Sequence, residues 1–229
     1  MAGTPMQSLV ELEAELALLK KYPQHDLEEI IKEVGFSCTN CGKCCTKEFN
    51  GHVFLLAKDA KRLKTFAPEA LMPAPGFPYS DTSGNFYVSG YALKTQENGD
   101  CVFLDEHKRC RIYDQRFTIC RVYPYMLHRE PDERGKIDWR QISGFDEHGE
   151  YDCVISEEEC AKIAEDTIAY ETAFLEQEID FHKAVLEKFS DEQIRFVRKD
   201  HDARVRACMK SGKATVFVWD GSDLVMEEL

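Results

Sequence analysis

The stretch that decides the fold is FSCTNCGKCC, residues 36–45, in which four cysteines fall within eight residues. These are Cys38, Cys41, Cys44 and Cys45. A gap of two residues between cysteines lets a tight turn bring both thiolates to one metal, as in zinc knuckles and iron–sulfur loops. A second block, CVFLDEHKRCRIYDQRFTICRVYPY at residues 101–125, adds Cys101, Cys110 and Cys120. The two blocks predict a metal-binding core built around cysteines.

Composition favours metal ligands over disulfides. The chain has 229 residues, ten cysteines and a formal net charge of -13. It lacks the run of about eighteen apolar residues that crosses a bilayer and a basic-then-apolar leader, so we expect a soluble, cytoplasmic protein without a membrane partner. Cytoplasmic thiols are kept reduced. Because nucleic-acid binding needs basic patches, the negative charge argues against nucleic acid as a partner, and we expect a protein partner or protein substrate on the separate grounds given below.

Three segments are predicted along the chain. Residues 1–35 form an N-terminal helical segment, residues 36–155 the cysteine-cluster metal-binding domain, and residues 156–229 C-terminal helices and a hairpin. We expect an α+β fold that is mostly helical, with an irregular cysteine-rich core and a small antiparallel hairpin.

Local signals mark the ends of these elements. Thr4 before Pro5 predicts the start of a first helix, and a second begins near Asp26 as its cap and stops at Gly35. The pair Ser156 and Glu159 is a capping box that predicts a long helix.

Further signals place the remaining elements. Ser190 with Gln193 predicts the start of another helix, which Gly212 closes. Asp220 and Gly221 predict the turn of the hairpin. Strand character after residue 85 breaks at Gly90.

The thiolates can divide in two ways. Adjacent side chains point apart, so Cys44 and Cys45 are not expected to be equivalent ligands of one ion. In one arrangement Cys38, Cys41 and one of that pair join a cysteine of the second block around a single centre. In the other, the seven cysteines of the blocks and Cys153 make eight ligands, enough for two four-thiolate sites.

Cys153 is the eighth candidate because it precedes a capped helix, whose N–H groups stabilise a thiolate. Cys160 and Cys208 lie inside predicted helices, where a buried cysteine packs as a small hydrophobe, although Cys160 could replace Cys153. The predicted metal ligands are Cys38, Cys41, Cys44, Cys45, Cys101, Cys110, Cys120 and Cys153.

Arginine and histidine residues are a second set of candidate site residues. Arginines around the second block would relieve the formal charge of four thiolates on a metal, or else pair with surface carboxylates. They are Arg109, Arg111, Arg116 and Arg121. The histidines His52, His107, His128 and His148 are scattered and form no ligand set by spacing. His107 lies between two predicted ligands and is either a minor contributor to the site or, as we expect, a loop residue.

The pattern CxxCxxCC, followed by CxFL, CxIY and CRxYP, resembles the cysteine-cluster family often called YkgJ-type, which is thought to chelate zinc or iron. The resemblance covers roughly residues 36 to 155. It departs from the family at Phe117, which follows Arg116 where the family usually has proline. The family is related to flagellin lysine N-methylases, which implies an iron–sulfur cluster, S-adenosylmethionine as a possible cofactor and a protein substrate.

Spacing allows both iron and zinc. The CxxCxxC start is the spacing of ferredoxin loops, whereas the second block has gaps of eight and nine residues and not the paired knuckles of zinc sites. We therefore expect a 4Fe4S cluster that serves electron transfer or a cluster-assisted reaction such as methyl transfer. The alternatives are a non-enzymatic zinc-binding module for protein interaction and a metal-trafficking protein. The radical S-adenosylmethionine signature CxxxCxxC is absent from the sequence.

Overall fold

A computed structural model describes residues 4–125 and 145–229 of the chain. Of the described residues, 49% are in helices and 15% in strands, which confirms the predicted α+β, mostly helical class. The chain divides into two compact units. Unit 1 comprises Met1–Ala14, Phe54–Lys94 and Leu175–Leu229, and unit 2 comprises Glu15–Val53 and Thr95–Phe174. The three segments predicted from the sequence are a different kind of division, and they stay a prediction.

The first two helices begin and end close to the predicted signals. Helix α1, Pro5–Leu19, follows Thr4, whose Oγ1 accepts a hydrogen bond from the backbone N–H of Gln7 at 3.4 Å. Helix α2, Gln24–Val34, ends at Gly35 in the left-handed conformation, with φ of 54°. It starts two residues before the predicted cap, because Pro23 already stands at its N-cap.

Unit 1 contains two small sheets. In the first, the order is β1-β5-β2 and all pairs are antiparallel. In the second, the order is β3-β4-β6-β7, and β4 pairs in parallel with β6 while the other pairs are antiparallel. The strands are β1 Phe54–Leu55, β2 Leu71–Pro73, β3 Tyr79–Ser80, β4 Phe86–Val88, β5 Tyr91–Leu93, β6 Thr215–Trp219 and β7 Leu224–Glu228.

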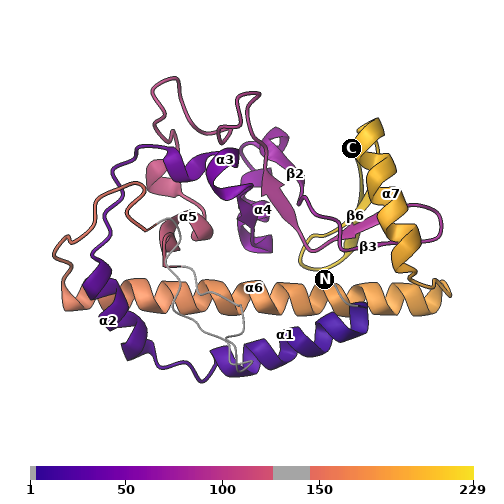
Figure 1. Cartoon of the computed structure of the whole chain (residues 1–229), viewed down its shortest axis with the longest axis horizontal. Helices are drawn as coiled ribbons and strands as arrows, with labels where there is room; N and C mark the ends of the chain where they lie inside the picture. The colour runs from indigo at the N-terminus through magenta and orange to yellow at the C-terminus, as the bar shows by residue number, and fades with distance from the viewer. Residues whose placement is uncertain (1–3, 126–144) are drawn as a thin grey trace. The chain divides into compact units, whose positions relative to one another are not determined.

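The predicted break at Gly90 is the point where the chain passes from one sheet to the other, between β4 and β5. The predicted C-terminal hairpin is β6–β7, and its turn is held by Asp220, whose Oδ1 accepts the N–H groups of Ser222 and Asp223. Figure 1 shows β6 and β3 near helix α7, Arg198–Ser211, within unit 1. Helix α4, Ala57–Lys64, follows β1 directly.

The long helix α6 spans Glu157–Asp191. The N-cap role predicted for Ser156 is confirmed, since the N–H of Glu159 donates to Ser156 Oγ at 3.2 Å. The predicted helix start at Ser190 is wrong because α6 continues through that residue, and Lys188 pairs with Glu192 at 2.6 Å across its last turn. The next helix, α7, begins only at Arg198 and ends before Gly212, as predicted.

The core of unit 1 includes a cluster of buried, mainly aromatic side chains. Buried side chains of the second sheet pack against the C-terminal part of α6. Tyr79 and Tyr87 come from the sheet, and Phe181, Val185 and Phe189 come from α6. Among the helices of the described residues, none combines the length and apolar character needed to cross a membrane.

Unit 2 has short regular elements between its longer helices. They are the 3-10 turns Lys43–Cys45 and Tyr113–Gln115 and the helices α3, Lys47–Asn50, and α5, Thr118–Val122. Both cysteine blocks lie in this irregular part, as predicted.

Candidate metal centre

The first cysteine block folds into a tight turn. Gly42, with φ of 74°, precedes the 3-10 turn Lys43–Cys45, and its carbonyl accepts the N–H of Cys45 at 3.0 Å. The sulfurs of Cys44 and Cys45 lie 3.8 Å apart. The expectation that these side chains diverge is wrong, because successive residues of a 3-10 turn are about 120° apart around its axis and do not alternate between opposite faces as in a strand.

Backbone hydrogen bonds join the two blocks. The N–H of Cys101 donates to the carbonyl of Cys45 at 2.8 Å, and the N–H of Cys110 donates to Asn40 Oδ1 at 3.1 Å. The guanidinium of Arg109 donates to the carbonyl of Asn40 at 3.0 Å. Residues more than 50 positions apart in the sequence are therefore braced against one another.

The thiols of the two blocks interact electrostatically. The pKa of Cys45 is raised above its ordinary range by its hydrogen bond with Cys44, by burial and by the nearby Cys41. Burial raises the pKa of Cys101 to about 12, and Cys45 and Cys110 add to the shift.

The same interactions extend to the rest of the second block. Burial raises the pKa of Cys120, and Cys45, Cys101 and Cys110 raise it further. The pKa of Cys110 is raised by burial, and Cys45 and Cys38 contribute. Seven thiols thus form one network, which we call the thiol network: Cys38, Cys41, Cys44, Cys45, Cys101, Cys110 and Cys120.

Cys41 is the exposed member of the thiol network. Partial burial raises the pKa of its thiol, but backbone N–H groups of Lys43 and Gly149 and the side chain of Thr39 donate to the sulfur and lower the pKa overall. Such N–H donors stabilise a thiolate, which is the form that binds metal.

Two of the four predicted arginines act on the thiol network. The charge of Arg116 lowers the pKa of three of its thiols, and its guanidinium lies 3.9 Å from the centre of the Tyr113 ring. Arg111 acts in the same way on Cys101. Arg109 instead donates a hydrogen bond to the backbone of the first cysteine block, and Arg121 is exposed.

Cys153 stands in a different setting. Its sulfur faces the carbonyl of Tyr151 at 3.8 Å, and its N–H donates to the carbonyl of Gly35 at 2.9 Å. Burial raises the pKa of Tyr125 to about 12, and Cys160, Tyr151 and Cys153 add to that shift. Cys153 therefore shares a neighbourhood with the buried Cys160 of α6. Its role as a ligand stays a prediction, as does that of each other predicted cysteine.

The donor atoms suit zinc or iron, but the side chains do not form a closed cage. Among residues 4–125 and 145–229, no three His, Cys, Asp or Glu side chains are grouped tightly enough to hold a metal ion. The thiol network supplies soft ligands in excess of the four that one ion takes. Closing them around a metal requires side-chain rotation from the positions described.

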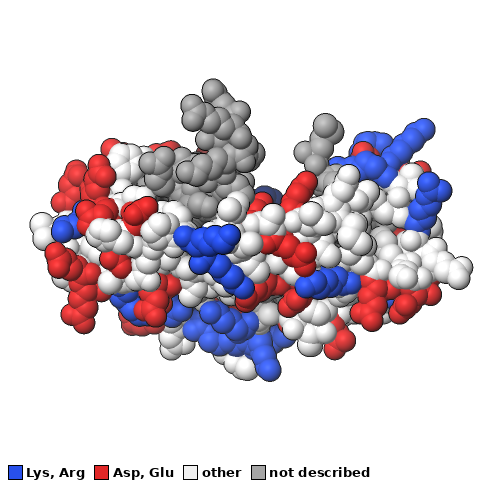
Figure 2. Space-filling model, turned by 90° about the horizontal axis from the view of Figure 1, so that it is seen from below, with Lys and Arg blue, Asp and Glu red and all other residues white. Residues whose placement is uncertain are grey.

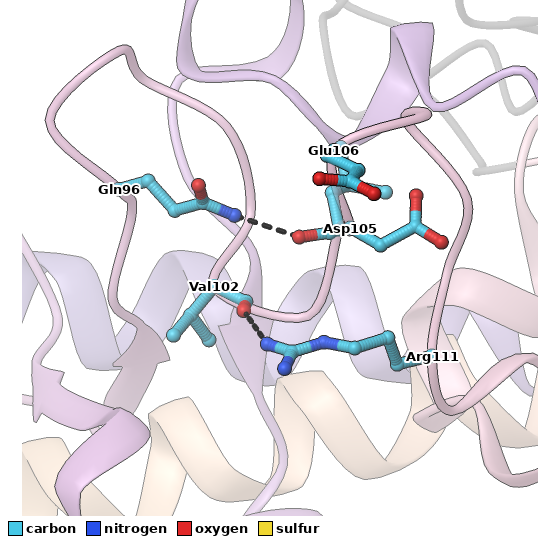
Figure 3. A pocket seen from close by; sticks show the side chains of 6 residues that line it. Gln96, Val102, Asp105, Glu106 and Arg111 are labelled. Carbon is cyan, nitrogen blue, oxygen red and sulfur yellow. Dashed lines mark hydrogen bonds between the residues drawn. The ribbon is translucent and has the colours of Figure 1, made fainter.

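A polar hollow of about 580 Å³ lies beside the second block (Figure 3). Gln96 reaches across it, donating from Nε2 to the carbonyls of Leu104 at 2.8 Å and Cys101 at 3.1 Å. Arg111 donates to the carbonyl of Val102 at 2.7 Å. These bonds hold the backbone that follows Cys101. The lining residues are Gln96, Val102, Leu104, Asp105, Glu106 and Arg111.

Acidic side chains gather over α2 and the start of α6, at the left of the view in Figure 2. The first turn of α6 carries three glutamates, and one of them, Glu157, lies 3.6 Å from Lys32 of α2. A face of this charge repels phosphate backbones. The nature of the partner stays a prediction.

His148 is a buried residue that its spacing in the sequence did not mark as part of a ligand set. Its side chain packs against three aromatic rings, and neither ring nitrogen has a hydrogen-bond partner within the described part of the chain. It lies more than 100 residues from the first block, so only tertiary contacts reveal its place. Another of the scattered histidines, His128, lies outside the described residues.

Comparison with known proteins gives one family. The family model "CxxCxxCC: Putative zinc- or iron-chelating domain" matches residues 37–167. A protein of Methanocaldococcus jannaschii, named "Uncharacterized protein MJ0661", is 29% identical over 118 residues, which cover 48% of this chain and 55% of that protein. The match thus spans about half the length of this relative. No solved structure gives a significant match.

Proposed function

Because the chain belongs to the CxxCxxCC family, described as a "Putative zinc- or iron-chelating domain", we propose that unit 2 binds iron as a 4Fe4S cluster through cysteines of the thiol network. The observation that carries this proposal is that six thiols, from two blocks far apart in the sequence, interact at Cys45, and that Cys38 joins them through Cys110. Neighbouring thiolates repel one another, which raises the pKa of each buried thiol. A metal cation that replaces the protons offsets this repulsion.

Two further observations support a cluster. Arg116 and Arg111 supply positive charge at the thiol network, which offsets the excess negative charge of a thiolate-bound cluster. Backbone N–H groups donate to the thiol of Cys41, and hydrogen bonds to sulfur tune the reduction potential of such centres. The cysteines of the thiol network would hold the iron, and the cluster would supply a one-electron couple.

Electron transfer is the simplest function for such a cluster, because it needs no binding site for a second cofactor. Cluster-assisted methyl transfer to a protein would also need a site for S-adenosylmethionine, for which the sequence has no recognisable motif. In either use we propose a protein, in the cytoplasm, as the partner.

A second candidate function is a single zinc ion in a purely structural module that binds a partner protein. The observation that favours it is the separation of 3.8 Å between the sulfurs of Cys44 and Cys45. Two thiolates on one tetrahedral zinc, with Zn–S bonds of about 2.3 Å, lie about 3.8 Å apart. Neighbouring ligands of a cluster bind different irons and lie further apart.

The test is anaerobic purification followed by iron, zinc and sulfide analysis and an absorption spectrum on one sample. We expect a brown protein with about four iron and four sulfide per chain. Cys45→Ser should lose this content, whereas Cys208→Ser, in α7 of unit 1, should keep it. A colourless protein with zinc would refute the cluster and favour the second candidate. A chain without metal above trace would refute both.

A further inference from the structure

The segment around His148 is fastened to the first cysteine block. Ser37 and Glu150 exchange two backbone hydrogen bonds, of 2.8 and 2.9 Å. The N–H of Gly149 donates to the thiol of Cys41. Cys38, the first cysteine of the block, directly follows Ser37, and His148 directly precedes Gly149. The histidine is therefore held next to the cysteine loop by contacts on its C-terminal side.

Contacts on the other side complete this attachment. Lys43, within the first block, donates from Nζ to the carbonyl of Glu147 at 2.8 Å. The ring of His148 lies 4.9 Å from that of Phe49 in α3, the helix that begins two residues after Cys45. The imidazole is thus placed between the loop that carries the cysteines and the helix that follows it.

The imidazole of His148 is buried without a polar partner. The residue is 8% exposed, and its ring centre lies 5.9 Å from that of Phe36 and 5.3 Å from that of Tyr123. Both ring nitrogens are fully buried, and the described residues offer neither of them a hydrogen bond. Buried polar atoms in folded proteins are almost always paired, so these nitrogens require a partner that the described side chains do not supply.

Water is a poor candidate for that partner. A buried water needs two to four polar neighbours, and the surroundings of this ring are mainly aromatic. A metal ion needs only the lone pair of one imidazole nitrogen, and neutral histidine is the commonest protein ligand of transition metals. The neighbouring thiols of the first block already offer soft ligands for the same ion.

We propose that His148 supplies a nitrogen ligand to the metal held by the first cysteine block, so that the centre has mixed sulfur and nitrogen ligation. This inference rests on the proposed metal binding. The ring and the thiols are not closed around one point in the described arrangement, so metal binding requires these side chains to move toward one another.

The competing explanation is that His148 only fills space among aromatic rings. His148→Phe separates the two, because phenylalanine keeps an aromatic ring of similar size and removes both nitrogens. His107→Phe is the matched control: His107 lies in the same unit, between two cysteines of the second block, and 77% of its side chain is exposed.

The experiment is X-ray absorption at the K edge of the metal that the full-length chain carries, with metal retention measured against a competing chelator. In the wild type we expect a nitrogen scatterer at about 2.0–2.1 Å beside sulfur at about 2.3 Å. His148→Phe should lose the nitrogen and bind the metal at least tenfold more weakly, a loss typical of weakened ligation, while His107→Phe matches the wild type.

The outcomes separate this inference from the proposed function. Metal bound through sulfur alone in the wild type overturns the role of His148 and leaves the proposed function standing, and this result does not depend on any variant folding. Unchanged ligation and affinity in His148→Phe overturn it as well. A wild-type chain that binds no metal overturns the proposed function and the inference with it.

Discussion

Gly42→Ala tests whether the two cysteine blocks are braced against each other. Gly42 has φ of 74°, in the left-handed region that disfavours a side chain. A Cβ at this position would lie 2.5 Å from the backbone oxygen of Lys108 and 3.2 Å from its Cβ. Lys108 belongs to the loop between Cys101 and Cys110, so the added methyl group pushes the first block away from the second.

Two costs add in this variant. A left-handed conformation costs an alanine roughly 1–2 kcal/mol. Forcing a methyl group into occupied space costs about 1–3 kcal/mol more, and here the obstacle is backbone, which yields less readily than a side chain. The expected loss in the free energy of unfolding is therefore about 2–5 kcal/mol.

Gly99→Ala is the matched control in the same unit. Gly99 has φ of 86°, but a Cβ there would meet only the Cβ of Lys47, at 3.5 Å. This variant should lose roughly 1–2 kcal/mol, the conformational cost alone. The difference between the two variants, about 1–3 kcal/mol, measures the clash with Lys108.

The assay is urea unfolding followed by far-ultraviolet circular dichroism, with linear extrapolation for each variant. Metal content is measured on the same samples, and Gly42→Ala should retain less metal than Gly99→Ala because its two blocks are spread apart. Equal losses of stability in the two variants would refute the reasoning, since they would show that the Lys108 loop moves aside freely and does not brace the first block.

Three further predictions concern pH, a buried amide and metal removal. Burial lowers the pKa of His182 in the folded chain. Below pH 6.5 the unfolded chain therefore takes up a proton that the folded chain resists, and the free energy of unfolding should fall. The urea midpoint, measured between pH 7.5 and 5, should fall less in His182→Gln than in the wild type. Gln177→Leu removes the acceptor of the Ala57 N–H at 2.7 Å and the donor to the Ser89 carbonyl at 2.9 Å. It should cost about 2–4 kcal/mol, and thermal melting should drop by at least 4 °C, whereas a change under about 2 °C would contradict the role of this amide. Removing the metal with a chelator should lower the melting temperature, because a ligand that binds only the folded chain stabilises it; an unchanged melt would count against coupling of the metal to folding.

Local sequence signals predicted several helix ends and a turn correctly. The caps at Thr4 and Ser156, the end of α2 at Gly35 and the turn at Asp220 are correct because each depends on hydrogen bonds within a few residues. The start predicted at Ser190 failed because a serine inside a helix resembles one at its cap when only the neighbouring sequence is considered.

The sequence by itself determined that this is a cysteine-rich chelating protein, since thiol spacing and charge are properties of the chain alone. Only the tertiary structure decided which thiols lie together, that Cys153 stands with Cys160 instead, and that His148 is buried beside the first block. These arrangements depend on contacts between residues up to about a hundred positions apart, which form only when many segments pack at once. No local pattern records such packing, because its free energy belongs to the assembled core and not to any one segment.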